Sequence, residues 1–457
     1  MKPTKFKNTI RSLMTLCLLL TMAGIFWLTW IFAYQENIVL PFWRKGNWLV
    51  VAVYGFLLYT FTHMYGGYKI GSLRLTELLY SQILSILFVN ILFYFQISLI
   101  ARWFAALAPY LYMTLIQIAA TILLTFCANK LYFKIYPPRR MILVYGQDKG
   151  LNIICKMNSR REKFDIAGRV SVDRGVEEIC RKLYDYEGVV LNDVPDPQRG
   201  QIVNFCYEKN IRTYLVPKVT DVLVSSSDSL HLFDTPLMLL RNKGIASESL
   251  ALKRCVDILL SGCLLLLFSP VMLITALAIK VCDRGPVFYR QERLTLEGKI
   301  FRIYKFRSMR IDAEKDGVAR LATMHDERIT AVGKWIRRWR LDELPQLLNV
   351  LKGEMSMVGP RPERPEIAAE YQSWMPEFSY RLKVKAGITG YAQILGRYDT
   401  TPYDKLLLDL MYIEGYSLFL DIKLILMTLK VLFWPESSAG IKDGARLPVE
   451  EGENANL

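Results

Sequence analysis

Four long apolar segments open the chain, separated by short polar loops. They lie at roughly 12–33, 47–66, 77–100 and 107–129, and each is close to the ~20 residues that an α-helix needs to cross a bilayer. Four such segments in succession are unusual for a soluble fold, whose surface helices carry a polar face. The pattern therefore predicts a four-helix transmembrane unit over residues 1–136.

Positive charge is distributed unevenly around these segments. The basic residues before the first segment, after the second and after the fourth are Lys2, Lys5, Lys7, Arg11, Lys69, Arg74, Lys130, Lys134, Arg139 and Arg140. The loops after the first and third segments are poorer, with Arg44 and Lys45 in one and Arg102 in the other. Because cytoplasmic loops of membrane proteins are enriched in Lys and Arg, we expect both ends of the four-helix unit in the cytoplasm.

A different pattern follows Pro137-Pro138. Strand-like runs near 141–146, 165–172, 188–192 and 212–216 alternate with helical segments near 150–159 and 198–209. This alternation predicts a small parallel α/β domain, which we place at 141–245. Its first turn, VYGQDKG, keeps only Gly146 and Gly150 of a dinucleotide-binding glycine pattern. We therefore expect a degenerate Rossmann-like domain that does not bind NAD.

A fifth apolar run, Ile258–Ile279, is interrupted in its middle by Ser269-Pro270. Proline removes a helical hydrogen bond, so a bend is expected there, and Ser269 or a packed helix could satisfy the freed carbonyl groups. The flanks are basic on both sides, with Lys253, Arg254, Lys280 and Arg284. This charge distribution favours a re-entrant helix that returns to the side it entered. The alternative, a kinked spanning helix, would place residues 283–457 across the membrane.

The remainder of the chain is more polar and contains amphipathic stretches. ITAVGKWIRRWR (329–340) mixes Trp and Ile with Lys and Arg, as is typical of a helix that lies in the lipid headgroup layer. Residues 404–434 form a second amphipathic stretch. Together with the re-entrant helix they predict a mostly α-helical domain over 250–434, and the polar, acidic tail 435–457 is expected to be disordered.

Composition narrows the class of protein further. Hydrophobic residues make up 52% of the 457 residues, which fits a chain partly in lipid, so this is expected to be a mixed membrane protein. The net charge of +15 resides mostly beside apolar segments and in the second half, which favours a membrane surface or a phosphorylated substrate over nucleic acid. The eight cysteines form no CxxC pair, and three histidines leave little material for a His-built metal site.

The segment LDELPQLLNVLKGEM (341–355) holds the main candidates for chemistry. Asp342 and Glu343 precede Pro345 and an apolar stripe, so they are expected at a helix N-terminus, where the ionised carboxylate is favoured. An ionised carboxylate can act as a nucleophile or as an Mg²⁺ ligand. Simple N-capping is the alternative reading of this pair.

Basic and glycine-rich segments surround this pair in the sequence. KFRSMR supplies Lys305 and Arg307, and in GPRPERPE two prolines hold Arg361 rigidly, as suits bidentate contact with a phosphate. In KAGITGYAQILGR the glycines permit close approach of a ligand, and Arg397 could reach its phosphate. A basic surface strip and ordinary turns are the alternatives.

These segments stand within one longer stretch, GPVFYRQER…GKIFRIYKFRSM…RITAVGKWIRRWRLDELPQLLNVLKGEMSMVGPRPERP…AGITGYAQILGR. It closely resembles the bacterial polyprenyl-phosphate sugar-1-phosphate transferases, the monotopic phosphoglycosyl transferases that initiate capsule, exopolysaccharide and O-antigen synthesis. The resemblance covers about 252–433. The order of four spans, Rossmann-like domain and catalytic domain also resembles the large members of this family.

The resemblance implies that Asp342 is the nucleophile, that Glu343 is its partner, and that both hold Mg²⁺. It also implies a re-entrant hairpin at Ser269-Pro270. From their side-chain chemistry, Lys305, Arg307, Arg361 and Arg397 are the candidates for contact with the donor phosphates. The implied substrates are a UDP-sugar, with glucose or galactose favoured, and undecaprenyl phosphate. The implied location is the bacterial inner membrane, with the catalytic domain in the cytoplasm.

Two other functions would fit the same domain plan. A membrane-anchored nucleotide-sugar dehydratase would need an intact glycine pattern and a helical YxxxK motif, whereas Tyr214 and Lys218 enclose Pro217 in a strand-end setting. A non-catalytic scaffold for polysaccharide assembly would leave the carboxylate pair without a role. The sequence identifies neither the sugar nor the oligomeric state, for which a homodimer is one candidate.

Overall fold

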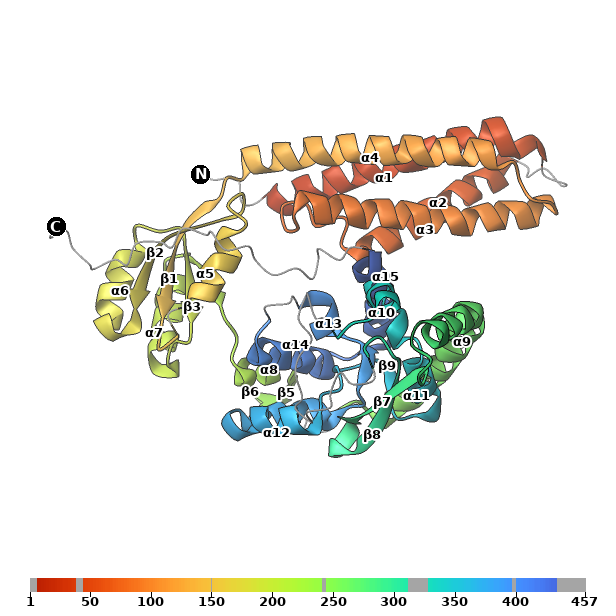
Figure 1. Cartoon of the computed structure of the whole chain (residues 1–457). Coiled ribbons are helices and arrows are strands. Elements are labelled where there is room, and N and C mark those ends of the chain that lie inside the picture. The colour runs from red at the N-terminus through yellow and green to blue at the C-terminus, as the bar shows by residue number, and fades with distance from the viewer. Residues whose placement is uncertain are drawn as a thin grey trace. The chain divides into compact units, whose positions relative to one another are not determined.

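The computed structural model describes residues 6–37, 44–148, 150–240, 244–310, 328–396 and 400–433. The predicted disordered tail 435–457 lies outside the described residues. The chain forms two compact units that divide between Val216 and Pro217. Figure 1 shows the helices and strands of both units.

The first unit begins with four long helices that correspond to the four predicted apolar segments. They are α1 (Lys7–Thr29), α2 (Arg44–Tyr65), α3 (Leu75–Ala101) and α4 (Leu107–Ile135). A π turn at Trp30–Tyr34 and a 3₁₀ turn at Gln35–Asn37 extend α1. All four are long and apolar enough to cross a membrane, and they lie side by side as a bundle (Figure 1).

The interior of this bundle contains a polar cluster with one member from each helix. Tyr54 of α2 donates its hydroxyl to Asn90 Oδ1 of α3 at 2.9 Å, and Asn90 donates to Gln117 Oε1 of α4 at 2.9 Å. Gln117 donates in turn to the Met22 carbonyl of α1 at 3.2 Å. Buried amides need partners in an apolar medium, so this closed set of hydrogen bonds favours one rotational setting of the helices.

The α/β part of the first unit is a four-stranded parallel sheet in the order β2-β1-β3-β4. Its strands are β1 (Arg139–Tyr145), β2 (Phe164–Ser171), β3 (Gly188–Asn192) and β4 (Arg212–Leu215). Its helices are α5 (Leu151–Asn158), α6 (Val176–Leu183) and α7 (Asp196–Glu208). The predicted strands and the helices near 150–159 and 198–209 are confirmed, and α6 is an addition that the sequence pattern did not predict.

The second unit starts earlier than the sequence pattern suggested. Part of the segment 217–245, which we assigned to the α/β domain, forms α8 (Val219–Ser225) and the hairpin of β5 (Asp228–Leu232) and β6 (Thr235–Leu239) within this unit. Val222 of α8 is buried in the core of the second unit. The assignment of this segment to the α/β domain was wrong, because α8 packs against α14 (Pro402–Glu414) of the second unit.

The rest of the second unit is mostly helical, as predicted. Its helices, besides α8 and α14, are α9 (Ser247–Asp283), α10 (Ala331–Arg338), α11 (Gln346–Lys352), α12 (Pro365–Trp374), α13 (Tyr391–Leu395) and α15 (Leu418–Phe433). A hairpin joins β7 (Phe288–Leu294) to β8 (Ile300–Phe306), and β9 (Ser356–Val358) pairs in parallel with β10 (Gly387–Thr389). The core includes Val350, Met355 and Leu410.

Helix α9 contains the fifth apolar run and keeps Pro270 in its interior. Proline cannot bond the carbonyl four residues before it, which here belongs to Leu266. The Ser269 hydroxyl donates to that carbonyl at 2.8 Å, so the partner expected for the freed carbonyl is present. Leu266 and Ile274 are 79% and 66% exposed on this helix, which gives it an apolar surface suited to lipid.

Both ends of α9 are packed against the same compact unit. Near its start, Arg254 donates to the carbonyl groups of Val350 and Leu351 at the end of α11, at 2.6 and 2.7 Å. Near its end, Ile279 is buried with Ile336 of α10. The two contacts lie on one domain although the apolar run between them is long enough to cross a bilayer.

Candidate active site

The chain turns sharply before the carboxylate pair. Helix α10 ends at Arg338, and Arg340 then adopts a left-handed backbone with φ +51°. Asp342 and Glu343 follow in a 3₁₀ turn at Leu341–Glu343, and α11 begins only at Gln346. A non-glycine residue in the left-handed region is strained, and such strain is often kept where it orients functional groups. The pair therefore precedes the helix instead of occupying its first turn.

Glu343 is surrounded by positive charge. Its side chain is 14% exposed, and its Oε1 accepts from Arg361 Nη2 at 3.0 Å and lies 3.5 Å from Lys305 Nζ. Its Oε2 lies 3.7 Å from Arg340 Nη1. Burial acts to raise the pKa of Glu343, but the three cations outweigh burial and hold this pKa well below its usual value. Glu343 is therefore ionised at neutral pH.

Asp342 has the opposite electrostatic setting. In the part of the chain that the structure describes, no cation lies within ion-pair distance of its carboxylate. Burial, and then the charge of Glu343, raise the pKa of Asp342 to about 6, while Lys305 and Arg337 act weakly to lower it. Burial and the neighbouring carboxylate thus act against the ionised form of Asp342 that a helix terminus was expected to favour, but a pKa of about 6 still leaves this carboxylate mostly ionised at neutral pH. Two adjacent carboxylates with separated pKa values are typical of a site with two roles.

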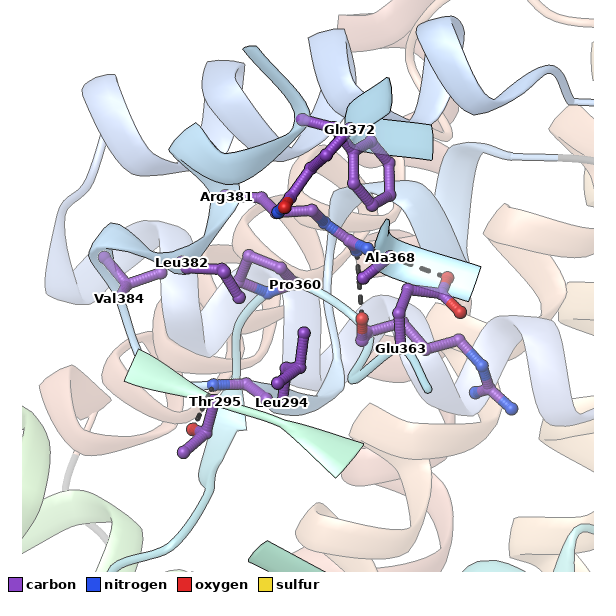
Figure 2. Close-up of a pocket in the computed structure, with 12 residues that line it drawn as sticks. Leu294, Thr295, Pro360, Glu363, Ala368, Gln372, Arg381, Leu382 and Val384 are labelled. Carbon is purple, nitrogen blue, oxygen red and sulfur yellow. Dashed lines mark hydrogen bonds and ion pairs between the residues drawn. The ribbon is translucent and has the colours of Figure 1, made fainter. Parts of the chain in front are cut away.

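The backbone of the turn that contains Arg361 is held in place by the buried side chain of Arg381. Arg381 donates from Nη2 to the Arg361 carbonyl at 2.9 Å and to Asp409 Oδ2 at 2.7 Å. Its Nη1 lies 3.6 Å from Glu363. Figure 2 shows Arg381 reaching toward Glu363 beside Pro360, where the side chains leave a cavity of only about 10 Å³. The tight packing fixes the backbone of the turn, while the Arg361 side chain remains 45% exposed.

Arg293 also belongs to this region, although the sequence pattern did not indicate it. It lines a small cavity of about 20 Å³ together with Lys305 and Arg361, and its Nη1 donates to the Pro362 carbonyl at 3.2 Å. Burial lowers the pKa of Arg293 to about 10. It stands on β7, more than fifty residues from the turn it holds, and no local sequence pattern indicates the contact between β7 and that turn.

The other predicted site residues are placed differently. The Arg307 guanidinium packs on Gly285, where an added Cβ would lie 2.1 Å from Nη1. Arg397 lies outside the described residues. Ser269 and Pro270 lie within α9. The structure therefore brings Lys305, Glu343 and Arg361 together and places Asp342 beside Glu343 in the chain, while Arg307 contacts the turn before β7.

The carboxylate pair consists of oxygen ligands of the kind that Mg²⁺ accepts. Among the described residues, no group of three or more His, Cys, Asp or Glu side chains converges on one point. Mg²⁺ is commonly held by one or two carboxylates together with substrate phosphates, so two carboxylates are a sufficient protein contribution. Asp342 is the more available ligand, because Glu343 already contacts three cations.

Helices long and apolar enough to cross a membrane, together with an α/β domain, define a membrane protein. Its carboxylate pair and basic residues lie in the segment that known proteins share. Residues 248–435 match the family of bacterial sugar transferases. The chain belongs to this family, and its relatives are named as undecaprenyl-phosphate sugar phosphotransferases.

Three relatives illustrate the extent of the similarity. A UDP-glucose:undecaprenyl-phosphate glucose-1-phosphate transferase of Klebsiella pneumoniae is 44% identical over 258 residues, covering 55% of this chain and 54% of that protein. A protein of the same name from Caulobacter vibrioides is 39% identical over 191 residues, 41% and 71% of the two chains. A UDP-N-acetylgalactosamine-undecaprenyl-phosphate N-acetylgalactosaminephosphotransferase of Aeromonas hydrophila is 37% identical over 253 residues, 54% and 59%. The matches thus span about half the length of the first relatives.

Proposed function

We propose that this protein transfers a sugar-1-phosphate from a UDP-sugar to undecaprenyl phosphate, as the first membrane step of surface polysaccharide synthesis. The observation that carries the proposal is the carboxylate of Asp342 directly before Glu343, whose own carboxylate lies 3.0 Å from Arg361, 3.5 Å from Lys305 and 3.7 Å from Arg340. Glucose or galactose is the proposed sugar. The names of relatives, which include glucose, galactose and N-acetylgalactosamine, support this class of donor.

The proposed reaction has two displacement steps. In the first, an Asp342 carboxylate oxygen bonds to the phosphorus that carries the sugar, the bond from this phosphorus to the bridging oxygen breaks, and UMP leaves with that oxygen. In the second, an oxygen of undecaprenyl phosphate attacks the same phosphorus, and the Asp342 carboxylate is released. The products are UMP and undecaprenyl-diphosphate-sugar, and the carboxylate is regenerated.

The surrounding residues would position the donor phosphates and stabilise their negative charge. Arg361 and Lys305 would contact the donor phosphates, since Arg361 is partly exposed and both already lie on one side of Glu343. Glu343 would keep these cations in place and, through its own charge, raise the basicity of Asp342. Mg²⁺, held by Asp342, Glu343 and the donor diphosphate, would supply positive charge that offsets the negative charge developing on phosphate oxygens.

We further infer that α9 is a re-entrant hairpin in the inner membrane, with the catalytic domain in the cytoplasm. The packing of both helix ends against one domain supports this topology, because a straight span would separate them by a bilayer. The basic flanks support the same orientation. Trp335 and Trp339, at 57% and 45% exposed at the end of α10, would lie at headgroup depth.

The activity is tested by measuring UMP release. Membranes that contain the protein are incubated with undecaprenyl phosphate and, one at a time, with UDP-glucose, UDP-galactose and UDP-N-acetylgalactosamine. We expect UMP and a labelled diphosphate lipid from at least one donor. Release of UDP instead of UMP would indicate transfer of the sugar alone and would contradict the proposal. Formation of a keto-sugar without UMP would indicate a dehydratase.

The pH dependence is a separate prediction. Asp342 must be ionised to attack, so kcat/KM is expected to rise with pH and level off above about pH 6. Glu343→Gln removes a like charge and should move the rise to lower pH. Lys305→Met removes a cation that lowers the pKa of Asp342 and should move the rise to higher pH. An unchanged midpoint in both variants would show that another group controls the profile.

The topology prediction uses native cysteines that flank the apolar run. Cys255 and Cys282 are exposed on α9, so two proteins can be made that each retain one of them. We expect an impermeant maleimide to label both only after the cells are permeabilised. Trp103→Cys, in the loop predicted to be periplasmic, is the control that should be labelled from outside. Labelling of Cys282 but not Cys255 in intact cells would establish a spanning helix.

A further inference from the structure

A second basic site lies in the first unit. It is a cleft of about 580 Å³ between the ends of α1 and α4 and one edge of the α/β sheet. Its lining includes the basic residues Lys7, Lys134, Arg139, Arg140, Lys163 and Arg212. Asp165 and Glu187 are the acidic residues of the same lining. Positive side chains thus outnumber negative ones by six to two.

The cleft lies at the amino edge of the parallel sheet. Arg139 is paired in register with Phe164, the residue after Lys163, and Arg212 is paired with Gly188. These positions are where the strands begin. Dinucleotides in Rossmann-type folds bind at the opposite, carboxyl edge, so this basic cleft is not the remnant of a dinucleotide site.

The walls of the cleft are built by close packing. The Lys7 ammonium lies 5.6 Å from the centre of the Tyr132 ring of α4. Gly71 faces the same ring with φ +69°, and an added Cβ would lie 1.9 Å from it. Arg160 donates to the Ser72 carbonyl, so the loop that contains Gly71 is also bound to the α/β domain. The cleft therefore has a defined shape, fixed by contacts from both sides.

The cations of the cleft repel one another. Burial, followed by the charges of Arg160 and Lys7, lowers the pKa of Lys163. Burial, followed by the charge of Arg212, lowers the pKa of Arg139. Within the described residues, neither Lys163, Arg139 nor Arg212 forms an ion pair with a carboxylate. An anion bound among them would relieve this repulsion.

We propose that this cleft binds a phosphate-bearing anion, either the headgroup of an anionic lipid or a free phosphate compound. Arg139, Arg140 and Arg212 offer guanidinium groups that can contact phosphate oxygens in pairs. Lys7 and Lys134 come from the first and last turns of apolar helices, where lipid headgroups would lie. Basic pockets at the cytoplasmic ends of membrane helices are typical sites for anionic headgroups.

The test measures binding to the full-length protein in nanodiscs. One preparation contains phosphatidylcholine alone, a second adds phosphatidylglycerol, and a third is phosphatidylcholine with inorganic pyrophosphate in solution. We expect the unfolding temperature of the wild type to rise in the second or the third arm. A rise with phosphatidylglycerol alone assigns the site to lipid. A rise with pyrophosphate assigns it to a soluble compound only where cleft variants lose that rise, because pyrophosphate can also bind at Arg361 and Lys305. No rise in either arm overturns the proposal.

Variants locate the effect at the cleft. Lys163→Gln combined with Arg212→Gln is expected to weaken binding by at least about tenfold, since charged hydrogen bonds are lost. Arg181→Gln, which removes one positive charge from the exposed side of α6 as Lys134→Gln removes one from the cleft, should bind as the wild type does. Lys134→Gln is a milder second variant should the double variant fold poorly. Equal binding by wild type, Lys134→Gln and the double variant would place the anion elsewhere. Because the readout is binding, its failure leaves the transferase proposal untouched.

Discussion

Replacing Asp342 by asparagine is expected to abolish turnover and the sugar-phosphate adduct together. Asparagine keeps the shape of the side chain but lacks the anionic oxygen that would attack phosphorus. Loss of a covalent nucleophile lowers kcat by roughly 10⁴-fold or more in well-studied enzymes. Intact-mass analysis after incubation with UDP-sugar and Mg²⁺, without lipid acceptor, would reveal the adduct on the wild type and its absence from Asp342→Asn.

Glu343→Gln is the matched control for this experiment, because it alters the adjacent carboxylate in the same way. It should also lower turnover strongly, since Arg361 and Lys305 lose their anionic partner. It should nevertheless retain a trapped adduct if Glu343 acts in the second step. Near-normal turnover and an unchanged adduct in Asp342→Asn would show that Asp342 is not the nucleophile, and Glu343 would become the leading candidate.

The largest effect on stability is expected from Arg381→Met. The side chains of Arg381 and Asp409 are 4% and 1% exposed, so the substitution leaves a buried carboxylate without its cation. Breaking such a pair from one side costs about 3–5 kcal/mol. The same change removes the hydrogen bond to the Arg361 carbonyl. The kcat/KM for the UDP-sugar should therefore fall even at temperatures where the protein stays folded.

Thermal unfolding in detergent, followed by intrinsic fluorescence, measures the loss of stability. The control is Arg381→Met combined with Asp409→Leu, which replaces both charges with apolar side chains and should recover much of the stability. It should not recover donor use, because the support of the Arg361 carbonyl is still missing. Equal unfolding temperatures for wild type and Arg381→Met would show that the ion pair contributes little to stability.

The sequence alone predicted the elements whose signal is local. Long apolar runs gave α1 to α4, and alternating short runs gave β1 to β4, because each pattern depends on neighbours within a few residues. The sequence also singled out Lys305, Glu343 and Arg361, which the structure brings together. Their spacing in the chain does not indicate that they lie close together in space. The prediction rested on residue type and on similarity to a known family.

What the sequence did not predict depends on contacts between distant segments. Arg293 reaches the Arg361 turn only because β7 lies against it, and residues 217–245 join the second unit through Val222. The pKa of Asp342 depends on how deeply the turn is buried, which no local pattern encodes. The left-handed backbone at Arg340, two residues before Asp342, was also not predicted. A glycine would have indicated such a backbone, but this position is an arginine.

The hydrogen bonds from Arg254 to the end of α11 limit the distance between the start of α9 and the carboxylate pair. Helix α11 has seven residues, so it is about 10 Å long at 1.5 Å per residue. The carboxylate pair stands just before one end of this helix, and Arg254 near the start of α9 contacts the other end. Under the proposed re-entrant topology, the phosphate of a membrane-bound acceptor would meet the carboxylates close to the plane in which it already resides. Catalysis would require sideways diffusion of the lipid and no extraction of its tail from the bilayer.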